Sequence, residues 1–114
     1  MENHENRELI QKLLDCVSAC DQCSTASLQE ENAGHLANCI RLTRDCADMC
    51  AQSDRLLQRE SEIAYQFLLL CEEICRKCAE ECSKHDHEHC KRCAEACLIC
   101  ADICHSYHEP ITQD

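Results

Sequence analysis

Residues 71–82 read CEEICRKCAEEC, and residues 90–104 read CKRCAEACLICADIC. Successive cysteines in both stretches are three or four positions apart, which places them on one face of an α-helix. Two earlier groups have related spacings, at Cys16, Cys20 and Cys23 and at Cys39, Cys46 and Cys50. A motif C-A-[D/E]-x-C also recurs four times, beginning at Cys46, Cys78, Cys93 and Cys100. The pattern predicts four helices, each with a thiol-bearing face turned inward and carboxylates turned outward.

The rest of the chain has the composition of helices, with abundant Ala, Leu and Glu, only one Gly and only one Pro. Breaks in the pattern predict helices over about residues 4–30, 33–57, 61–84 and 87–107, with Ser61 and Asp86 as candidate N-caps of the last two. The short links favour antiparallel neighbours. We therefore expect an all-α, up-down-up-down four-helix bundle with a cysteine-lined core, forming a single domain over residues 1–114.

The composition of the chain excludes several classes of function. Aromatic residues make up 3% of the chain and cysteines number 15, so thiols must fill much of the core. The net charge of −11 opposes binding to nucleic acid or to an anionic membrane surface, and the longest apolar run is too short to span a bilayer. The polar, acidic N-terminus and the odd cysteine count favour a cytoplasmic protein whose thiols serve metal or redox chemistry.

Charge distinguishes between the metals that thiolates bind. A zinc site with four cysteines carries a net charge of −2, and several such sites would accumulate uncompensated charge in a narrow core. Cu(I) accepts two or three thiolates, and each sulfur can bridge two metals. One Cu(I) per thiolate replaces one proton per thiol, so the core stays near neutral as it fills. The pattern therefore favours many copper(I) ions per chain as the bound cofactor.

All fifteen cysteines are the candidate metal ligands: Cys16, Cys20, Cys23, Cys39, Cys46, Cys50, Cys71, Cys75, Cys78, Cys82, Cys90, Cys93, Cys97, Cys100 and Cys104. Thr43 occupies the inward position between Cys39 and Cys46, where the spacing would predict another thiol. Met49 lies between two cysteines, and we expect it to pack between helices rather than to bind metal.

Other functions remain open at this point. A zinc-binding or iron–sulfur redox protein would also use four thiolates for each site. A low-capacity copper chaperone would use far fewer thiols than this chain has. The sequence contains no motif for catalysis or for a substrate pocket, so we expect no enzymatic activity.

Over residues 7–107 the sequence resembles the cytosolic copper storage proteins of bacteria. The resemblance is most specific in the two stretches that begin at Cys71 and His89, which are joined by a link rich in His and Asp. It implies inward-facing cysteine ligands, storage rather than catalysis, and a homotetramer.

The antiparallel arrangement also predicts that the two ends of the bundle differ. The links near Gly34 and Asp86 should lie at the same end, and the thiol stripes extend to it. Four histidines gather there as candidate first ligands for incoming copper: His35, His85, His87 and His89. We expect an apolar plug at the far end, formed by Leu9, Leu13, Leu57, Ile63 and Leu68.

Overall fold

A computed structural model describes residues 6–108 of the chain. The helices are α1 (Arg7–Leu28), α2 (Ala37–Gln58), α3 (Ala64–Cys82) and α4 (Glu88–His108), with a short 3-10 helix, η2 (Ala33–Leu36), before α2. Each of the long helices has a cysteine-bearing face that is buried and a charged face that is exposed. The expected four helices are therefore confirmed.

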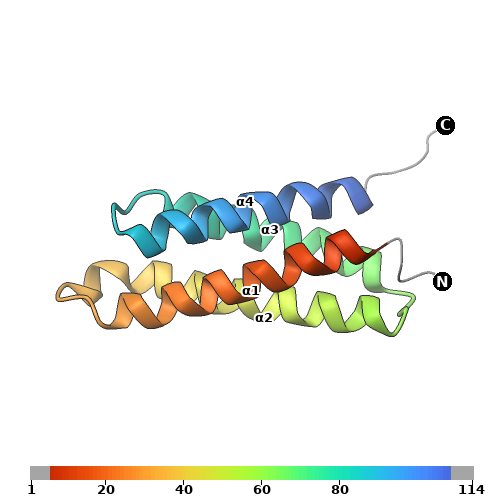
Figure 1. Cartoon of the computed structure of the whole chain (residues 1–114), viewed down its shortest axis with the longest axis horizontal. Coiled ribbons are helices and arrows are strands. Elements are labelled where there is room, and N and C mark those ends of the chain that lie inside the picture. Colours follow the sequence, from red (N-terminus) through yellow and green to blue (C-terminus); the bar gives the residue numbers. More distant parts are fainter. Residues whose placement is uncertain (1–5, 109–114) are drawn as a thin grey trace.

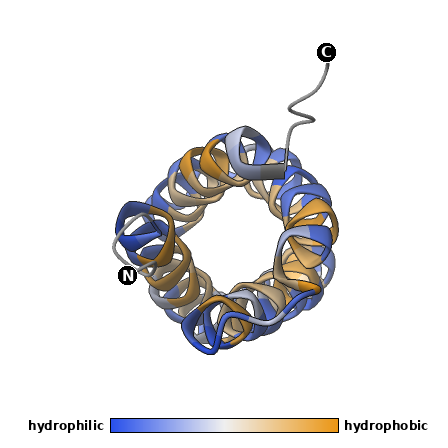
Figure 2. Cartoon of the chain, turned by 90° about the vertical axis from the view of Figure 1, so that its right-hand side faces the viewer, coloured by the Kyte–Doolittle hydropathy of each residue, from blue (hydrophilic) through white to orange (hydrophobic). Residues whose placement is uncertain are grey.

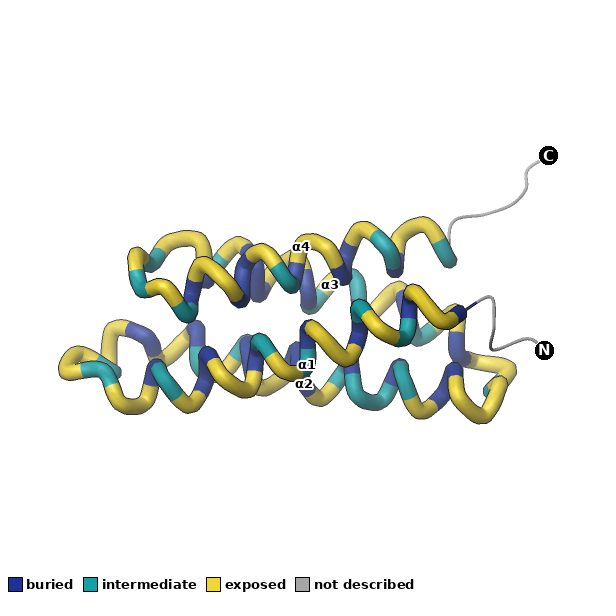
Figure 3. Tube along the Cα trace, viewed as in Figure 1, coloured by how far each residue is buried: buried dark blue, intermediate teal, exposed yellow. Residues whose placement is uncertain are grey.

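Neighbouring helices run in opposite directions, as Figure 1 shows. Viewed end-on, the four helices form a ring in which each one packs against two neighbours, α1 between α2 and α4 and α3 between α2 and α4 (Figure 2). Buried positions follow the inner side of every helix along the bundle axis (Figure 3). The fold is the predicted up-down-up-down four-helix bundle, with an elongated shape of 50 × 27 × 18 Å.

Several predicted helix boundaries were wrong. The first helix begins at Arg7 and ends at Leu28, and the predicted start at residue 4 lies outside the described residues. The second prediction merged two elements, because a 3-10 turn over Ala33–Leu36 precedes the α-helix. The third helix begins at Ala64 instead of residue 61, and it ends at Cys82. The fourth, predicted over 87–107, occupies Glu88–His108, so Asp86 does not directly precede it.

The turn between α2 and α3 explains why Ser61 is not an N-cap. The Ser61 N–H donates to Leu56 O at 2.9 Å and the Glu60 N–H donates to Leu57 O at 3.1 Å. These two bonds close the C-terminus of α2 as a Schellman motif, with Glu60 in the left-handed region at φ 53°. Ser61 thus closes the end of α2, and its Oγ also accepts the Ile63 N–H at 3.3 Å, but Ile63 rather than Ser61 is the residue that precedes α3.

The two ends of the bundle differ as expected. The 29–36 and 83–87 links lie at one end, hereafter the mouth, and the α2–α3 turn lies at the other (Figure 1). Leu9, Leu13, Leu57 and Leu68 are buried and form the apolar plug. Ile63 is 49% exposed and does not belong to it, because it lies in the turn before α3 begins. Among the described residues, no helix combines the length and the apolar character that crossing a bilayer requires.

Candidate metal centre

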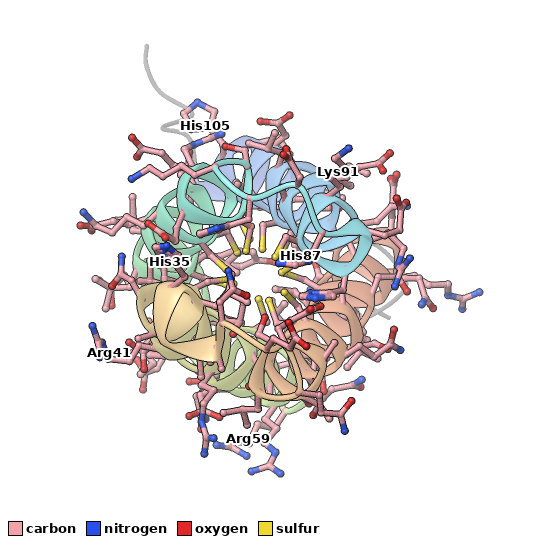
Figure 4. All side chains as sticks on the ribbon, turned by 90° about the vertical axis from the view of Figure 1, so that its left-hand side faces the viewer. His35, Arg41, Arg59, His87, Lys91 and His105 are labelled. Carbon is pink, nitrogen blue, oxygen red and sulfur yellow. The ribbon has the colours of Figure 1, made fainter. Side chains whose placement is uncertain are left out.

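All fifteen cysteines are free thiols with no exposed surface. Figure 4 looks along the axis from the mouth and shows sulfur atoms at the centre of the ring, while Arg41, Arg59 and Lys91 point outward. The three- and four-residue spacings keep every thiol on the inner face of its helix. The predicted inward orientation is therefore present at each position, and the sulfurs form one column, hereafter the thiol column.

Sulfur–sulfur distances in the column suit shared metals better than disulfides. Cys39 Sγ lies 3.4 Å from Cys82 Sγ, and Cys46 Sγ lies 3.6 Å from Cys75 Sγ. A disulfide bond is about 2.05 Å long. The cysteines of one helical turn are close as well, since Cys16 Sγ and Cys20 Sγ are 4.0 Å apart. Ligands therefore approach one another both along a helix and across the bundle.

Sets of sulfurs that could surround one ion overlap along the column. At least four sets of four cysteines in residues 6–108 have all their sulfurs within 4.8 Å of one another: Cys20, Cys78, Cys93 and Cys97; Cys16, Cys20, Cys46 and Cys97; Cys16, Cys46, Cys50 and Cys75; Cys50, Cys71, Cys75 and Cys100. Each set shares at least one cysteine with another. A single set could hold a zinc ion, but filling all of them requires sulfurs that bridge two metals. Bridging thiolates are a feature of Cu(I) chemistry.

Burial raises the pKa of the core thiols, which favours their protonated form at most positions. Desolvation, together with the neighbouring Cys23, raises the pKa of Cys90 to about 12. Cys23 itself has a lowered pKa because it accepts hydrogen bonds from Cys39 and Cys82. A neutral thiol packs as a small apolar group, so the core is stable without a charge at most positions. Copper binding must then release protons as it proceeds.

Four cysteines at the mouth, one from each helix, form the outer end of the column. Cys23 Sγ lies 4.0 Å from Cys39 Sγ and 3.9 Å from Cys90 Sγ, and Cys39 contacts Cys82. His89 contacts this group directly, since its Nδ1 lies 3.4 Å from Cys23 Sγ and 3.6 Å from Cys90 Sγ. An imidazole nitrogen and two sulfurs thus meet at the outermost level of the column.

A carboxylate orients His89. Its Nε2 lies 2.9 Å from a carboxylate oxygen of Glu30, and the side chain is 11% exposed. Burial disfavours the imidazolium, but the hydrogen bonds with Cys23 and Glu30 outweigh it and raise the pKa of His89. His87 stacks on the same ring, with ring centroids 5.2 Å apart, and its Nδ1 lies 3.3 Å from Glu30. Glu30 therefore bridges two histidines of the predicted cluster.

The other two histidines are placed differently. His85 Nε2 pairs with Glu81 at 3.0 Å, and this hydrogen bond is the main reason that the pKa of Glu81 is lowered. His35 lies in the exposed 3-10 helix. All four histidines lie at the mouth as predicted, but His89 is the member with a described contact to thiols.

Sequence reasoning missed Glu30 and Glu81 as partners of these histidines. Glu81 could have been found, because it lies four residues before His85 and faces it across one turn. Glu30 gave no such signal, since it follows the end of α1 and contacts residues 59 positions away. Met49 is half-buried and lines a groove between α2 and α3 with Leu70 and Ile74, which agrees with a packing role.

Comparison with known proteins identifies the family. The family model for copper storage proteins matches residues 2–109. A cysteine-rich protein of Bacillus subtilis, YhjQ, described as uncharacterized, is 45% identical over 97 residues, which is 85% of this chain and 90% of that protein. The structure of the Cu(I)-bound copper storage protein BsCsp3 of Bacillus subtilis superposes with a TM-score of 0.88 at 43% identity, covering 90% of this chain and 97% of the other.

A structure of a cytosolic copper storage protein from Streptomyces lividans, described with five coppers, superposes with a TM-score of 0.91. Its identity is 32%, over 97% of this chain and 98% of that one. The sequence match, the shared fold and the buried thiols thus all indicate the same family. This chain belongs to the copper storage protein family.

Proposed function

We propose that this protein stores and buffers many Cu(I) ions in the cytosol, with all fifteen core cysteines as ligands and no enzymatic activity. The overlap of the four-thiol sets is the observation that carries this proposal. Sulfurs shared between sets would bridge metals, and one Cu(I) per thiolate would keep the core near neutral. Residues 1–114 act as a single copper-binding domain. The cytosolic location is supported by the description of the Streptomyces lividans relative.

A mixed-metal experiment tests this function against the zinc alternative. The reduced protein is incubated without oxygen with an excess of Cu(I) and of Zn(II) together, desalted, and analysed for both metals. We expect copper in large excess over zinc and a colourless solution, because the d¹⁰ Cu(I) ion has no d–d absorption. Zinc in near-stoichiometric sets of four thiols would contradict the proposal. A coloured, redox-active product would instead favour an iron–sulfur or redox protein.

Copper would enter at the mouth, where His89 reaches the outermost thiols. His89 Nδ1 is the nitrogen that an incoming ion meets beside Cys23 and Cys90, and an ordinary imidazole has a pKa well below that of a thiol. We expect His89→Ala, and more strongly the triple replacement of His85, His87 and His89, to slow copper uptake from a competing chelator several-fold. Final capacity should stay close to that of the wild type, because the thiols remain.

His35→Ala is the matched control, since His35 lies at the same end but is exposed on η2. It should load at the wild-type rate. Uptake by the triple variant at the wild-type rate would show that these histidines are only a solvated link. Removing the mouth thiols Cys82 and Cys90 should reduce both rate and capacity.

The family resemblance also implies a homotetramer. Exposed apolar side chains on the outer faces of α3 and α4 could form such contacts: Leu69, Leu70, Leu98 and Ile99. A native mass near that of four chains would support this assembly, and a mass near that of one chain would refute it.

A further inference from the structure

A groove of about 360 Å³ runs along the side of the bundle between α1 and α4, hereafter the α1–α4 groove. Its lining includes Cys23 and His89, whose Sγ and Nδ1 atoms lie 3.4 Å apart. Lys12 also lines it and precedes Cys23 by eleven residues, so the groove extends about 16 Å along α1 from the mouth. A molecule that lies in this groove would therefore contact residues at the outermost level of the thiol column.

Charged side chains of both signs line the α1–α4 groove. Lys12 and Arg92 supply two cations, and Asp15 and Glu95 supply two carboxylates. Within residues 6–108, neither Lys12 nor Arg92 forms an ion pair or a side-chain hydrogen bond. The chain has twice as many acidic as basic residues, so two cations without a carboxylate partner in one groove are free to bind the carboxylates of a ligand.

The spacing of the two cations indicates the size of that ligand. Arg92 lies near the level of Cys20, because the adjacent Cys93 contacts Cys20 at 3.7 Å. Lys12 precedes Cys20 by eight residues, so the two cations are about 12 Å apart along the groove. An extended tripeptide spans about 10 Å. The groove thus suits a small peptide with a carboxylate at each end, and the two acidic residues can accept hydrogen bonds from its ammonium group.

We propose that the α1–α4 groove binds the Cu(I) complex of a small acidic peptide thiol and presents its copper to Cys23 and His89. Cu(I) is a soft ion that selects thiolates, so a thiol complex is a suitable donor. This inference rests on the proposed storage function and adds the class of donor from which the store is filled.

Transfer from this donor is a ligand exchange in which copper stays Cu(I). The bond between copper and Cys23 Sγ forms while one bond between copper and a carrier sulfur breaks. The proton of the Cys23 thiol passes to the departing carrier thiolate, so the carrier leaves as a thiol. Cys90, whose Sγ lies 3.9 Å from Cys23 Sγ, releases a second carrier thiol in the same way.

Loading rates from two Cu(I) donors test the groove. The reduced protein is mixed without oxygen with the Cu(I) complex of glutathione, an acidic tripeptide thiol, or of 2-mercaptoethanol, an uncharged thiol. Replacing Lys12 and Arg92 together with alanine should slow loading from the glutathione complex several-fold and leave loading from the mercaptoethanol complex unchanged. The matched control replaces Arg41 and Lys91, which point outward, with alanine. It makes the same change in net charge and should load from both donors at the wild-type rates.

Two further measurements leave the charges of the groove in place. S-methylglutathione has the charges of glutathione but no free thiol, so it should compete with the glutathione complex and slow loading from that donor alone. Ala96→Leu adds bulk to the lining of the groove without removing a charge or a thiol. It should slow loading from the glutathione complex several-fold.

Equal loading from the glutathione complex by the Lys12/Arg92 variant and by the Arg41/Lys91 control would overturn the donor site. Equal slowing with both donors, or no competition by S-methylglutathione, would overturn it as well. The final copper content of the same wild-type samples separates this inference from storage. Many ions per chain would leave storage intact, whereas about three or fewer would refute storage itself.

Discussion

Replacing Cys46 and Cys97 together with serine should remove about a third of the bound copper, well beyond the loss expected for two independent ligands. These two sulfurs contact each other at 3.9 Å and also contact Cys16 at 3.8 Å each. Cys46 further contacts Cys75, and Cys97 contacts Cys20. Because each sulfur would bridge neighbouring metals, losing this pair leaves several ions short of ligands. The copper content of desalted, saturated protein measures the effect.

The double variant should still fold. A buried serine is already accommodated in α2, where Ser53 Oγ donates to Met49 O at 2.8 Å. A serine at position 46 or 97 can bond its own helix in the same way. Circular dichroism of the metal-free protein checks this.

The matched control replaces Cys82 and Cys90 with serine. Both are mouth cysteines with fewer sulfur contacts than the central pair, so this variant should lose only about an eighth of the bound copper, the share of two thiols in fifteen. If the Cys46/Cys97 variant and the Cys82/Cys90 variant lost equal amounts of copper, the thiols would bind copper independently rather than as bridging ligands.

The position of the thiols could be predicted from sequence because it depends on helical periodicity alone. Cysteines at three- and four-residue intervals must share one face, and short links must bring the four faces together. Two consequences followed, the buried column and the asymmetry between mouth and plug. Both depend on register along a helix, which a sequence specifies well.

The details that were mispredicted lie in links between helices. Ser61 was expected to begin α3, but backbone hydrogen bonds to α2 hold it in a Schellman motif. Ile63 was expected in the plug and is exposed in the same turn. All four histidines were candidate first ligands for incoming copper, yet His89 contacts the thiols while His85 pairs with Glu81. The α2–α3 turn and the contacts of His89 with Cys23 and Glu30 depend on interactions between segments, which periodicity does not describe, whereas the His85–Glu81 pair follows i,i+4 spacing.

Capacity is the property in which this protein should differ most from a chaperone or a zinc protein. Fifteen thiolates that bridge metals approach one Cu(I) per sulfur, so saturation should require on the order of 10–20 ions per chain. The core can hold this number because each Cu(I) replaces one thiol proton, which leaves the net charge of the core near zero. A chaperone would bind one ion, and zinc sites of four thiols would bind about three.

The most direct test is an anaerobic Cu(I) titration of the fully reduced protein, with the remaining reactive thiols counted at each step. We predict a single saturation point at about 10–20 ions per chain, with all fifteen thiols protected from a thiol reagent under conditions in which the metal-free unfolded protein reacts completely. Saturation at one to about three ions, with most thiols still reactive after unfolding, would contradict storage by the thiol column.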